Sequence, residues 1–197
     1  MSILTDTIRK QFKEGDDIRD EGLTTPDTVQ RFDNILYGDD PEWNTMDLYI
    51  PKEEKEKLPI IISFHGGGWV YGDKERYQYY CMSLAERGFA VINFTYRLAL
   101  EFKHPAPLVD MNQVAHWIMN HAKDYFLDTE HIYGVGDSAG AHLLVLYTSI
   151  LTNKEYASTY DFKVPEGFQF NALALNCGAS DYSHGQARGV LIAKCSL

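Results

Sequence analysis

Two glycine-rich motifs, each directly behind an apolar segment, constrain the fold of this chain more than any other feature of its sequence. The motif H-G-G-G begins at His65, after the apolar run 58–64, and G-D-S-A-G begins at Gly136, after the run 131–135. Short apolar runs that end in glycine are typical of buried strands, and G-x-S-x-G is the pattern of a sharp turn from a strand into a helix. The motifs therefore predict two strands that end close together, with a serine exposed at the second turn.

Ser138, at the centre of the second motif, is the candidate nucleophile. A serine hydroxyl is a weak nucleophile, so it must be exposed beside a base, and the turn would lift it above the sheet edge. The N–H groups of Ala139, Gly67 and Gly68 would form an oxyanion hole. Each such donor contributes roughly 3–4 kcal/mol in the transition state. Asp137 is expected to point elsewhere and to brace the turn by hydrogen bonds.

Further apolar and amphipathic segments alternate along the chain between turn residues. The expected strands cover residues 31–37, 46–50, 58–64, 89–94, 131–135 and 170–176, and the expected helices cover residues 2–14, 78–87, 106–123 and 139–151. Strands that alternate with helices predict an α/β fold with a mostly parallel sheet and helices on both faces. In such a fold, the functional site lies at the carboxyl ends of the strands.

Four segments carry a family resemblance: H-G-G-G-W at 65–69, Y-R-L-A at 96–99, P-A-P at 105–107 and G-D-S-A-G at 136–140. Together they resemble the hormone-sensitive-lipase-like branch of the α/β-hydrolase superfamily, which contains carboxylesterases and lipases. The resemblance covers about residues 31 to 181, and Leu100 departs from it because the family usually has proline there. It implies an α/β-hydrolase fold and a serine hydrolase that acts on a small-molecule carboxylic ester. Ser138 would be its nucleophile, and Gly67, Gly68 and Ala139 its oxyanion donors.

The resemblance divides the chain into three parts. These are an N-terminal helical segment (1–30), a partial α/β-hydrolase core (31–181) and an atypical C-terminal tail (182–197). In the family, the N-terminal region helps to cover the active site. A helix that docks on the core without touching the substrate is an equal alternative.

The acid and the histidine that such a serine needs are harder to place. In this architecture, the order along the chain is serine, acid, histidine. Asp181 and His184 are the possible pair, but two residues so close on one loop do not easily place the histidine between the acid and Ser138. The segment 178–197 is too short for two more strand–helix units, so we interpret the chain as a truncated or frame-shifted copy that lacks the last strands. The strand 170–176 would then form a sheet edge, through which the chain could self-associate.

The remaining histidines are weaker candidates for a base. His65 is expected to organise the backbone of the glycine loop, and His142, one turn beyond Ser138, would point beneath the turn. His116 and His121 have the wrong spacing on a helix for shared metal ligands. Because no H-E-x-x-H is present either, we expect neither a metal nor another cofactor.

Composition and charge exclude several classes of function. The formal net charge of −10 argues against a nucleic-acid partner and against binding to an anionic membrane surface. No segment is long and apolar enough to span a membrane, and the first residues lack the pattern of a signal peptide. The three cysteines are widely spaced, which fits reduced thiols and a cytoplasmic location.

Three interpretations of the function remain. The chain is an incomplete copy of a serine ester hydrolase with impaired activity, or it is an active hydrolase with an unorthodox base such as His184. Alternatively, it is a non-catalytic small-molecule binder, like the gibberellin receptors, which resemble the same family and lack the catalytic histidine. Binding without hydrolysis would distinguish the third interpretation from the other two.

Overall fold

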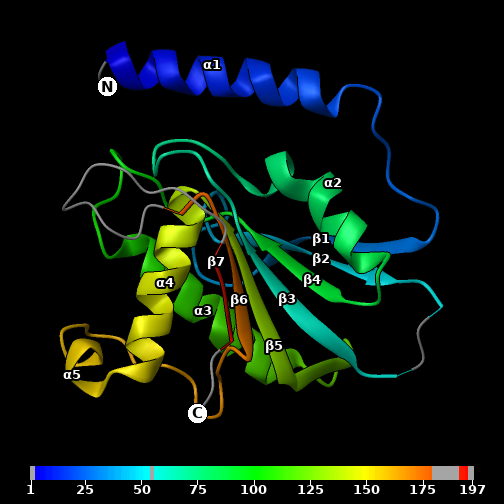
Figure 1. Cartoon of the computed structure of the whole chain (residues 1–197), viewed down its shortest axis with the longest axis vertical. Coiled ribbons are helices and arrows are strands. Elements are labelled where there is room, and N and C mark those ends of the chain that lie inside the picture. Colours follow the sequence, from blue (N-terminus) through cyan, green and yellow to red (C-terminus); the bar gives the residue numbers. More distant parts are fainter. Residues whose placement is uncertain (1–2, 54–55, 179–190, 195–197) are drawn as a thin grey trace.

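The computed structural model describes residues 3–53, 56–178 and 191–194. These residues form a sheet with helices on both faces, and a long N-terminal helix lies across one end of the molecule (Figure 1). The strands are β1 (Val29–Leu36), β2 (Thr45–Pro51), β3 (Leu58–Phe64), β4 (Ala90–Phe94), β5 (Leu127–Asp137), β6 (Ala172–Asn176) and β7 (Leu191–Lys194). The helices are α1 (Ile3–Asp20), α2 (Lys74–Ala85), α3 (Ala106–His121), α4 (Ala139–Thr152) and α5 (Lys154–Ala157).

The described strands form a seven-stranded sheet in the order β1-β2-β4-β3-β5-β6-β7. In its centre, β4, β3, β5 and β6 run parallel to one another. At one side, β2 pairs antiparallel with both β4 and β1. The mostly parallel α/β sheet that the sequence predicts is therefore confirmed.

The pairing of β3 with β5 brings the two glycine motifs together. Phe64, the last residue of β3, lies opposite Gly136 of β5, and the strands are parallel. Asp137 in turn lies opposite Asn176 at the end of β6. Both motifs therefore leave the sheet at the same edge, which is the arrangement expected from the sequence.

The expectation that the strand 170–176 forms the edge of the sheet is wrong. β7 pairs antiparallel with β6, from Ala172 opposite Lys194 to Leu175 opposite Leu191. A strand of four residues carries almost no periodic signal in the sequence. Its place is decided by the backbone donors and acceptors that β6 offers on its free side. The proposed self-association through an exposed β6 edge loses its basis.

The alternation of side chains along β3 separates two layers of the core. Ile60 and Ile62 face the larger cluster, to which α3 and α4 contribute, whereas Ile61 faces a smaller cluster with Cys81 and Met82 of α2. Helices on both faces of the sheet, as the sequence predicts, exclude water from these apolar strands.

Helix α2 begins earlier than predicted, at Lys74 rather than at residue 78. Asp73 caps its N-terminus, because its carboxylate accepts a hydrogen bond from the N–H of Arg76 at 3.1 Å. The helix therefore starts directly behind the H-G-G-G loop and packs against β2 and β4.

Helix α1 continues beyond the predicted end at residue 14, as far as Asp20. Neither this helix nor any other in the described ranges has the length and hydropathy needed to cross a membrane.

Candidate active site

Ser138 lies in the sharp turn between β5 and α4. Its φ of 49° is in the left-handed region, which residues other than glycine rarely adopt and which only a constrained backbone retains. The constraint comes from two sides: the Ser138 N–H donates to the carbonyl of Asn176 at 2.8 Å, and the Ser138 carbonyl accepts from the His142 N–H at 3.1 Å. The residue itself is exposed, as expected for a nucleophile at this turn.

Two glycines allow α4 to start against the end of β3. A Cβ on Gly140 would lie 2.1 Å from the carbonyl oxygen of Phe64 and 2.5 Å from that of His65. A Cβ on Gly136 would lie 2.7 Å from the backbone nitrogen of Ala141. Because these neighbours are backbone atoms, no side-chain rotation relieves the contacts, and the turn requires glycine at both positions.

The H-G-G-G loop holds two glycines at positive φ, 123° for Gly67 and 60° for Gly68. The Gly67 carbonyl accepts from the N–H of Tyr71 at 3.0 Å, which closes the loop into a turn. Within the described part of the chain, the N–H groups of Gly67 and Gly68 have no acceptor. Ala139, the first residue of α4, has no partner for its N–H within the helix. Unpaired N–H groups around an exposed serine favour a negatively charged oxygen.

His65 is a structural residue of this loop. Its ring is fully buried and stacks on Tyr96, with the centroids 4.0 Å apart. Burial lowers its pKa to about 4, so the ring is neutral at pH 7. Nδ1 lies 2.8 Å from the carbonyl of Gly66, to which it donates, and Nε2 has no hydrogen-bond partner among the described residues. A buried, neutral histidine that holds its own loop fits the expected organising role.

Asp137 braces the turn, as the sequence predicts. Its Oδ2 accepts from the Tyr77 hydroxyl at 2.8 Å, and that hydroxyl accepts from the Gly66 N–H at 3.1 Å. Tyr77 of α2 thus connects β5 with the glycine loop. Sequence reasoning missed Tyr77, because its partners lie 11 and 60 positions away and no motif marks the contact.

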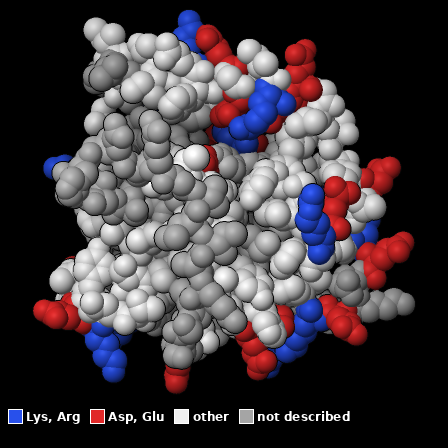
Figure 2. All heavy atoms as spheres, viewed as in Figure 1, with Lys and Arg blue, Asp and Glu red and all other residues white. Residues whose placement is uncertain are grey.

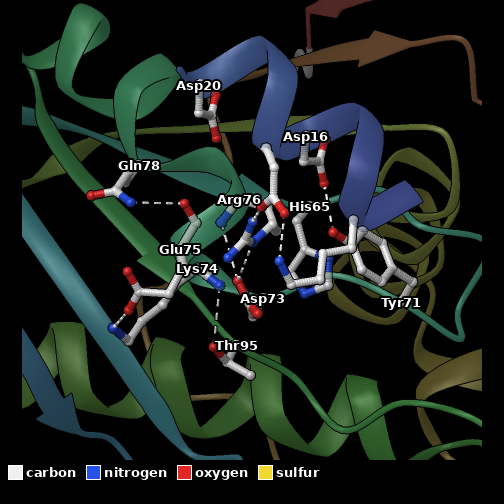
Figure 3. Close-up of polar contacts among 12 residues, drawn as sticks. Asp16, Asp20, His65, Tyr71, Asp73, Lys74, Glu75, Arg76, Gln78 and Thr95 are labelled. Atoms are coloured by element: carbon white, nitrogen blue, oxygen red, sulfur yellow. Dashed lines mark hydrogen bonds and ion pairs between the residues drawn. The ribbon is translucent and has the colours of Figure 1, made fainter. Parts of the chain in front are cut away.

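A cavity of about 460 Å³ lies between α1 and the two glycine motifs. Helix α1 contributes Phe12, Asp16 and Arg19 to its wall, and Tyr71 and Ser138 lie on the other side. Figure 3 shows the Asp16 side chain extending from α1 to the Tyr71 hydroxyl, above the loop that carries His65. Helix α1 therefore forms part of the wall of a cavity that Ser138 also lines.

Ion pairs and hydrogen bonds hold α1 in this place. The Arg9 guanidinium forms two hydrogen bonds of 2.8 Å with the Glu101 carboxylate, and its Nε donates to the Val70 carbonyl at 2.7 Å. The Tyr71 hydroxyl donates to Asp16 at 2.8 Å. Figure 2 shows basic and acidic side chains next to one another along this end of the molecule. The hydrogen bonds from Arg9 lower the pKa of Glu101 to about 2.

Several histidines of the sequence are candidates for a base beside Ser138. Asp181 and His184, the pair considered from the sequence, lie outside the described residues. The ring of His142 packs edge-on against Trp69 of the glycine loop, with the centroids 5.5 Å apart. Four other histidines have partners away from Ser138: the Tyr160 hydroxyl for His104, the Lys163 carbonyl for His116, the Trp117 carbonyl for His121 and the Asp128 carboxylate for His131.

The two other histidines considered for a metal each have their own partner. His116 Nε2 lies 3.0 Å from the Lys163 carbonyl, and His121 Nδ1 lies 2.9 Å from the Trp117 carbonyl. Among the described residues, no group of three or more His, Cys, Asp or Glu side chains is placed to hold a metal ion.

Comparison with known sequences points to esterases. The profile of the BD-FAE family matches residues 46–190, which include both glycine motifs. An ethyl acetate hydrolase of Pseudomonas putida is 28% identical over 157 residues, covering 78% of this chain and 49% of the relative. Esterase LipC of Mycobacterium tuberculosis is 30% identical over 135 residues, covering 68% of this chain and 32% of the relative. A versiconal hemiacetal acetate esterase of Dothistroma septosporum is 36% identical over 97 residues, covering 49% of this chain and 30% of the relative. The chain spans half or less of the length of these relatives.

Solved structures show the same architecture. Esterase B from Lactobacillus rhamnosis superposes with a TM-score of 0.83 at 29% identity, covering 88% of this chain and 57% of that chain. A bacterial heroin esterase superposes with a TM-score of 0.66 at 27% identity, covering 86% of this chain and 50% of that chain. Both similarities agree with the fold class predicted from the sequence.

Proposed function

Since the chain belongs to the BD-FAE family, among the esterases of the α/β-hydrolase superfamily, we propose that it is a serine carboxylic-ester hydrolase whose nucleophile is Ser138. One observation carries the proposal. Ser138 is exposed in a constrained turn and shares a cavity with Gly67 and Gly68, whose N–H groups have no acceptor in the described residues. Acyl transfer needs a nucleophile beside preorganised donors of this kind.

The chemistry follows from this arrangement. Ser138 Oγ attacks the ester carbonyl carbon, and the carbonyl oxygen becomes negative and accepts from the N–H groups of Gly67, Gly68 and Ala139. The bond from carbon to the alkoxy oxygen then breaks, and the alcohol leaves with the proton that the serine gave up. Water hydrolyses the acyl ester of Ser138 in a second step of the same kind.

Both steps need a base that takes and returns the proton. Asp181 and His184 are the residues of this sequence that would have to supply it. Because two residues so close together on one loop do not easily place the histidine between the acid and Ser138, we propose that the chain hydrolyses esters slowly. Serine hydrolases that lack a triad member retain about 10³–10⁴-fold acceleration over water.

The names of two relatives support a class of substrate. One is an ethyl acetate hydrolase and another is an esterase of versiconal hemiacetal acetate. We therefore propose small-molecule esters with a short acyl group as substrates. The cavity of about 460 Å³ beside Ser138 has room for such a molecule.

The alternative is a non-catalytic binder of small molecules. The observation that favours it is the same cavity, which lies between α1 and Ser138. A binder would retain the cavity and lose turnover, so an ester would bind without being hydrolysed.

The experiment that tests the proposal is hydrolysis of 4-nitrophenyl acetate by the purified chain, beside Ser138→Ala and His184→Ala. Slow release of nitrophenolate that disappears in Ser138→Ala would support an impaired hydrolase. Rapid turnover that disappears in both variants would support an active hydrolase with His184 as its base. Calorimetric binding of an ester without Ser138-dependent turnover would support the binder and overturn the hydrolase.

A further inference from the structure

The hydroxyl of Tyr77 lies at the meeting point of the two halves of the site. It accepts a hydrogen bond from the Gly66 N–H at 3.1 Å and donates one to Asp137 Oδ2 at 2.8 Å. Gly66 directly precedes the two glycines of the oxyanion hole, and Asp137 directly precedes Ser138. The Tyr77 hydroxyl therefore links Gly66, which precedes the candidate oxyanion donors, to Asp137, which precedes the candidate nucleophile.

The direction of these hydrogen bonds is determined by chemistry. A backbone N–H only donates and a carboxylate only accepts, so the phenol must stay protonated to satisfy both. Burial and the negative charge of Asp137 raise the pKa of Tyr77 well above its usual value, which keeps the proton on the hydroxyl. Since the Gly66 N–H is used by Tyr77, only the next two N–H groups of the loop remain for a ligand.

The backbone that carries Tyr77 is itself firmly held. Lys74, in the same turn of α2, is buried and lies 3.0 Å from the buried carboxylate of Asp47. Its backbone N–H donates to the Thr95 hydroxyl at 3.2 Å, and its carbonyl accepts from Asn93 at 2.6 Å. Figure 3 shows Lys74 and Thr95 close together, joined by this hydrogen bond. Helix α2 is thus anchored on β2 and β4, so that Tyr77 is a fixed support and not a mobile surface side chain.

Close packing at Gly66 supports the same conclusion. A Cβ on Gly66 would lie 2.9 Å from Asp137 Oδ2 and 3.0 Å from the Tyr77 hydroxyl oxygen. The loop, the carboxylate and the phenol are therefore closely packed at Gly66. Removing the hydroxyl would leave an N–H and a carboxylate oxygen without this partner.

We propose that Tyr77 is a positioning residue of the site: its hydroxyl sets the distance between the oxyanion donors of the glycine loop and the Ser138 nucleophile. The inference rests on the proposed function. Small displacements of such donors reduce the rate strongly, because they must meet the oxygen of the transition state and not that of the substrate. Tyr77 thereby acts on the chemical step through Gly66 and Asp137.

The test compares Tyr77→Phe with Tyr80→Phe. The control lies on the same helix, is partly exposed, and has no hydroxyl hydrogen bond in the described part of the chain. Amide hydrogen exchange, followed by NMR, reports on the loop without any need for activity. We expect exchange of the Gly66 N–H to become at least about tenfold faster in Tyr77→Phe and to be unchanged in Tyr80→Phe.

The kinetic readout uses 4-nitrophenyl acetate. In Tyr77→Phe we expect kcat to fall about ten- to a hundredfold with less than a twofold change in KM, and no change in either for Tyr80→Phe. Unchanged exchange at Gly66, or faster exchange with an unchanged kcat, would overturn the inference. If the unmodified chain shows no Ser138-dependent turnover, the hydrolase proposal fails, while the exchange result still decides whether Tyr77 holds the loop.

Discussion

Gly140 at the start of α4 is in direct backbone contact with Phe64 at the end of β3: a Cβ on the glycine would lie 2.1 Å from the Phe64 carbonyl oxygen. This contact places the turn that carries Ser138 against the strand that leads into the glycine loop. Backbone packing therefore brings the candidate nucleophile and the candidate donors together, and the hydroxyl of Tyr77 then joins their neighbours.

Substitution of Gly140 by alanine should disrupt this contact. We expect Gly140→Ala to lower the free energy of unfolding by about 3 kcal/mol or more, because the new methyl group meets backbone carbonyls that cannot rotate away. Gly15→Ala is the matched control, since a Cβ there meets no atom within 4 Å in α1. It should be neutral or stabilising by up to about 1 kcal/mol. Urea unfolding followed by circular dichroism measures the stability of both variants. Equal unfolding midpoints for Gly140→Ala and Gly15→Ala would contradict the close contact.

Loss of the buried ion pair between Lys74 and Asp47 should be costly. Both side chains are almost inaccessible to water, and Asp47 also accepts from the Asn34 N–H and from the Tyr49 hydroxyl. Lys74→Met would leave a buried carboxylate without its cation, and we expect a loss of about 3–5 kcal/mol in unfolding free energy.

The control for this variant is Lys13→Met, which breaks an exposed pair with Asp17 on α1. Exposed pairs contribute about 0–1 kcal/mol, so this variant should unfold near the midpoint of the parent chain. A Lys74→Met variant that unfolds at the same urea concentration as Lys13→Met would show that the buried pair does not stabilise the fold.

Stability should fall in mild acid because of His65. Its pKa is about 4 in the folded chain, below the ordinary histidine value of 6.5, since burial disfavours the charged ring. The unfolded chain therefore binds a proton first as the pH falls, and stability that is complete above pH 6.5 is lost progressively down to about pH 4. The loss attributable to His65 is about 3 kcal/mol at most. The free energy of unfolding can be measured by urea unfolding from pH 7 to pH 4. In His65→Gln this part of its pH dependence should be absent, whereas His116→Gln should retain it.

The attachment of α1 should weaken at a lower pH than the core. Arg9 depresses the pKa of Glu101 to about 2 from the ordinary glutamate value of 4.5, so this ion pair contributes fully above pH 4.5 and is lost as the pH falls through about 2. Both side chains are partly exposed, so the contribution is small and sensitive to salt. We expect Glu101→Gln to give faster amide exchange in α1 already at neutral pH.

Glu14→Gln is the control for this variant, because Glu14 pairs only along α1 with Lys10. Its amides in α1 should exchange as in the parent chain. If Glu101→Gln and the parent chain had equal exchange rates in α1, Arg9 and Glu101 would not be what holds the helix over the cavity.

Local patterns in the sequence predicted the elements that form the centre of the site. The apolar runs before His65 and Gly136 are indeed β3 and β5, and the residues after Ser138 form α4. The brace at Asp137 and the exposure of Ser138 were also predicted. These features follow from periodicity and from glycines that permit particular backbone angles, and both are properties of short segments.

The sequence by itself thus determined the fold class, the motif order and the position of the candidate nucleophile. Only the tertiary structure decided that β7 covers β6, that α1 closes a cavity over Ser138, and that Tyr77 joins the two motifs. Contacts such as Arg9 with Glu101 connect residues 92 positions apart. Which residues meet in such contacts depends on how the strands and helices pack in space. The spacing of residues along a single segment does not predict this packing.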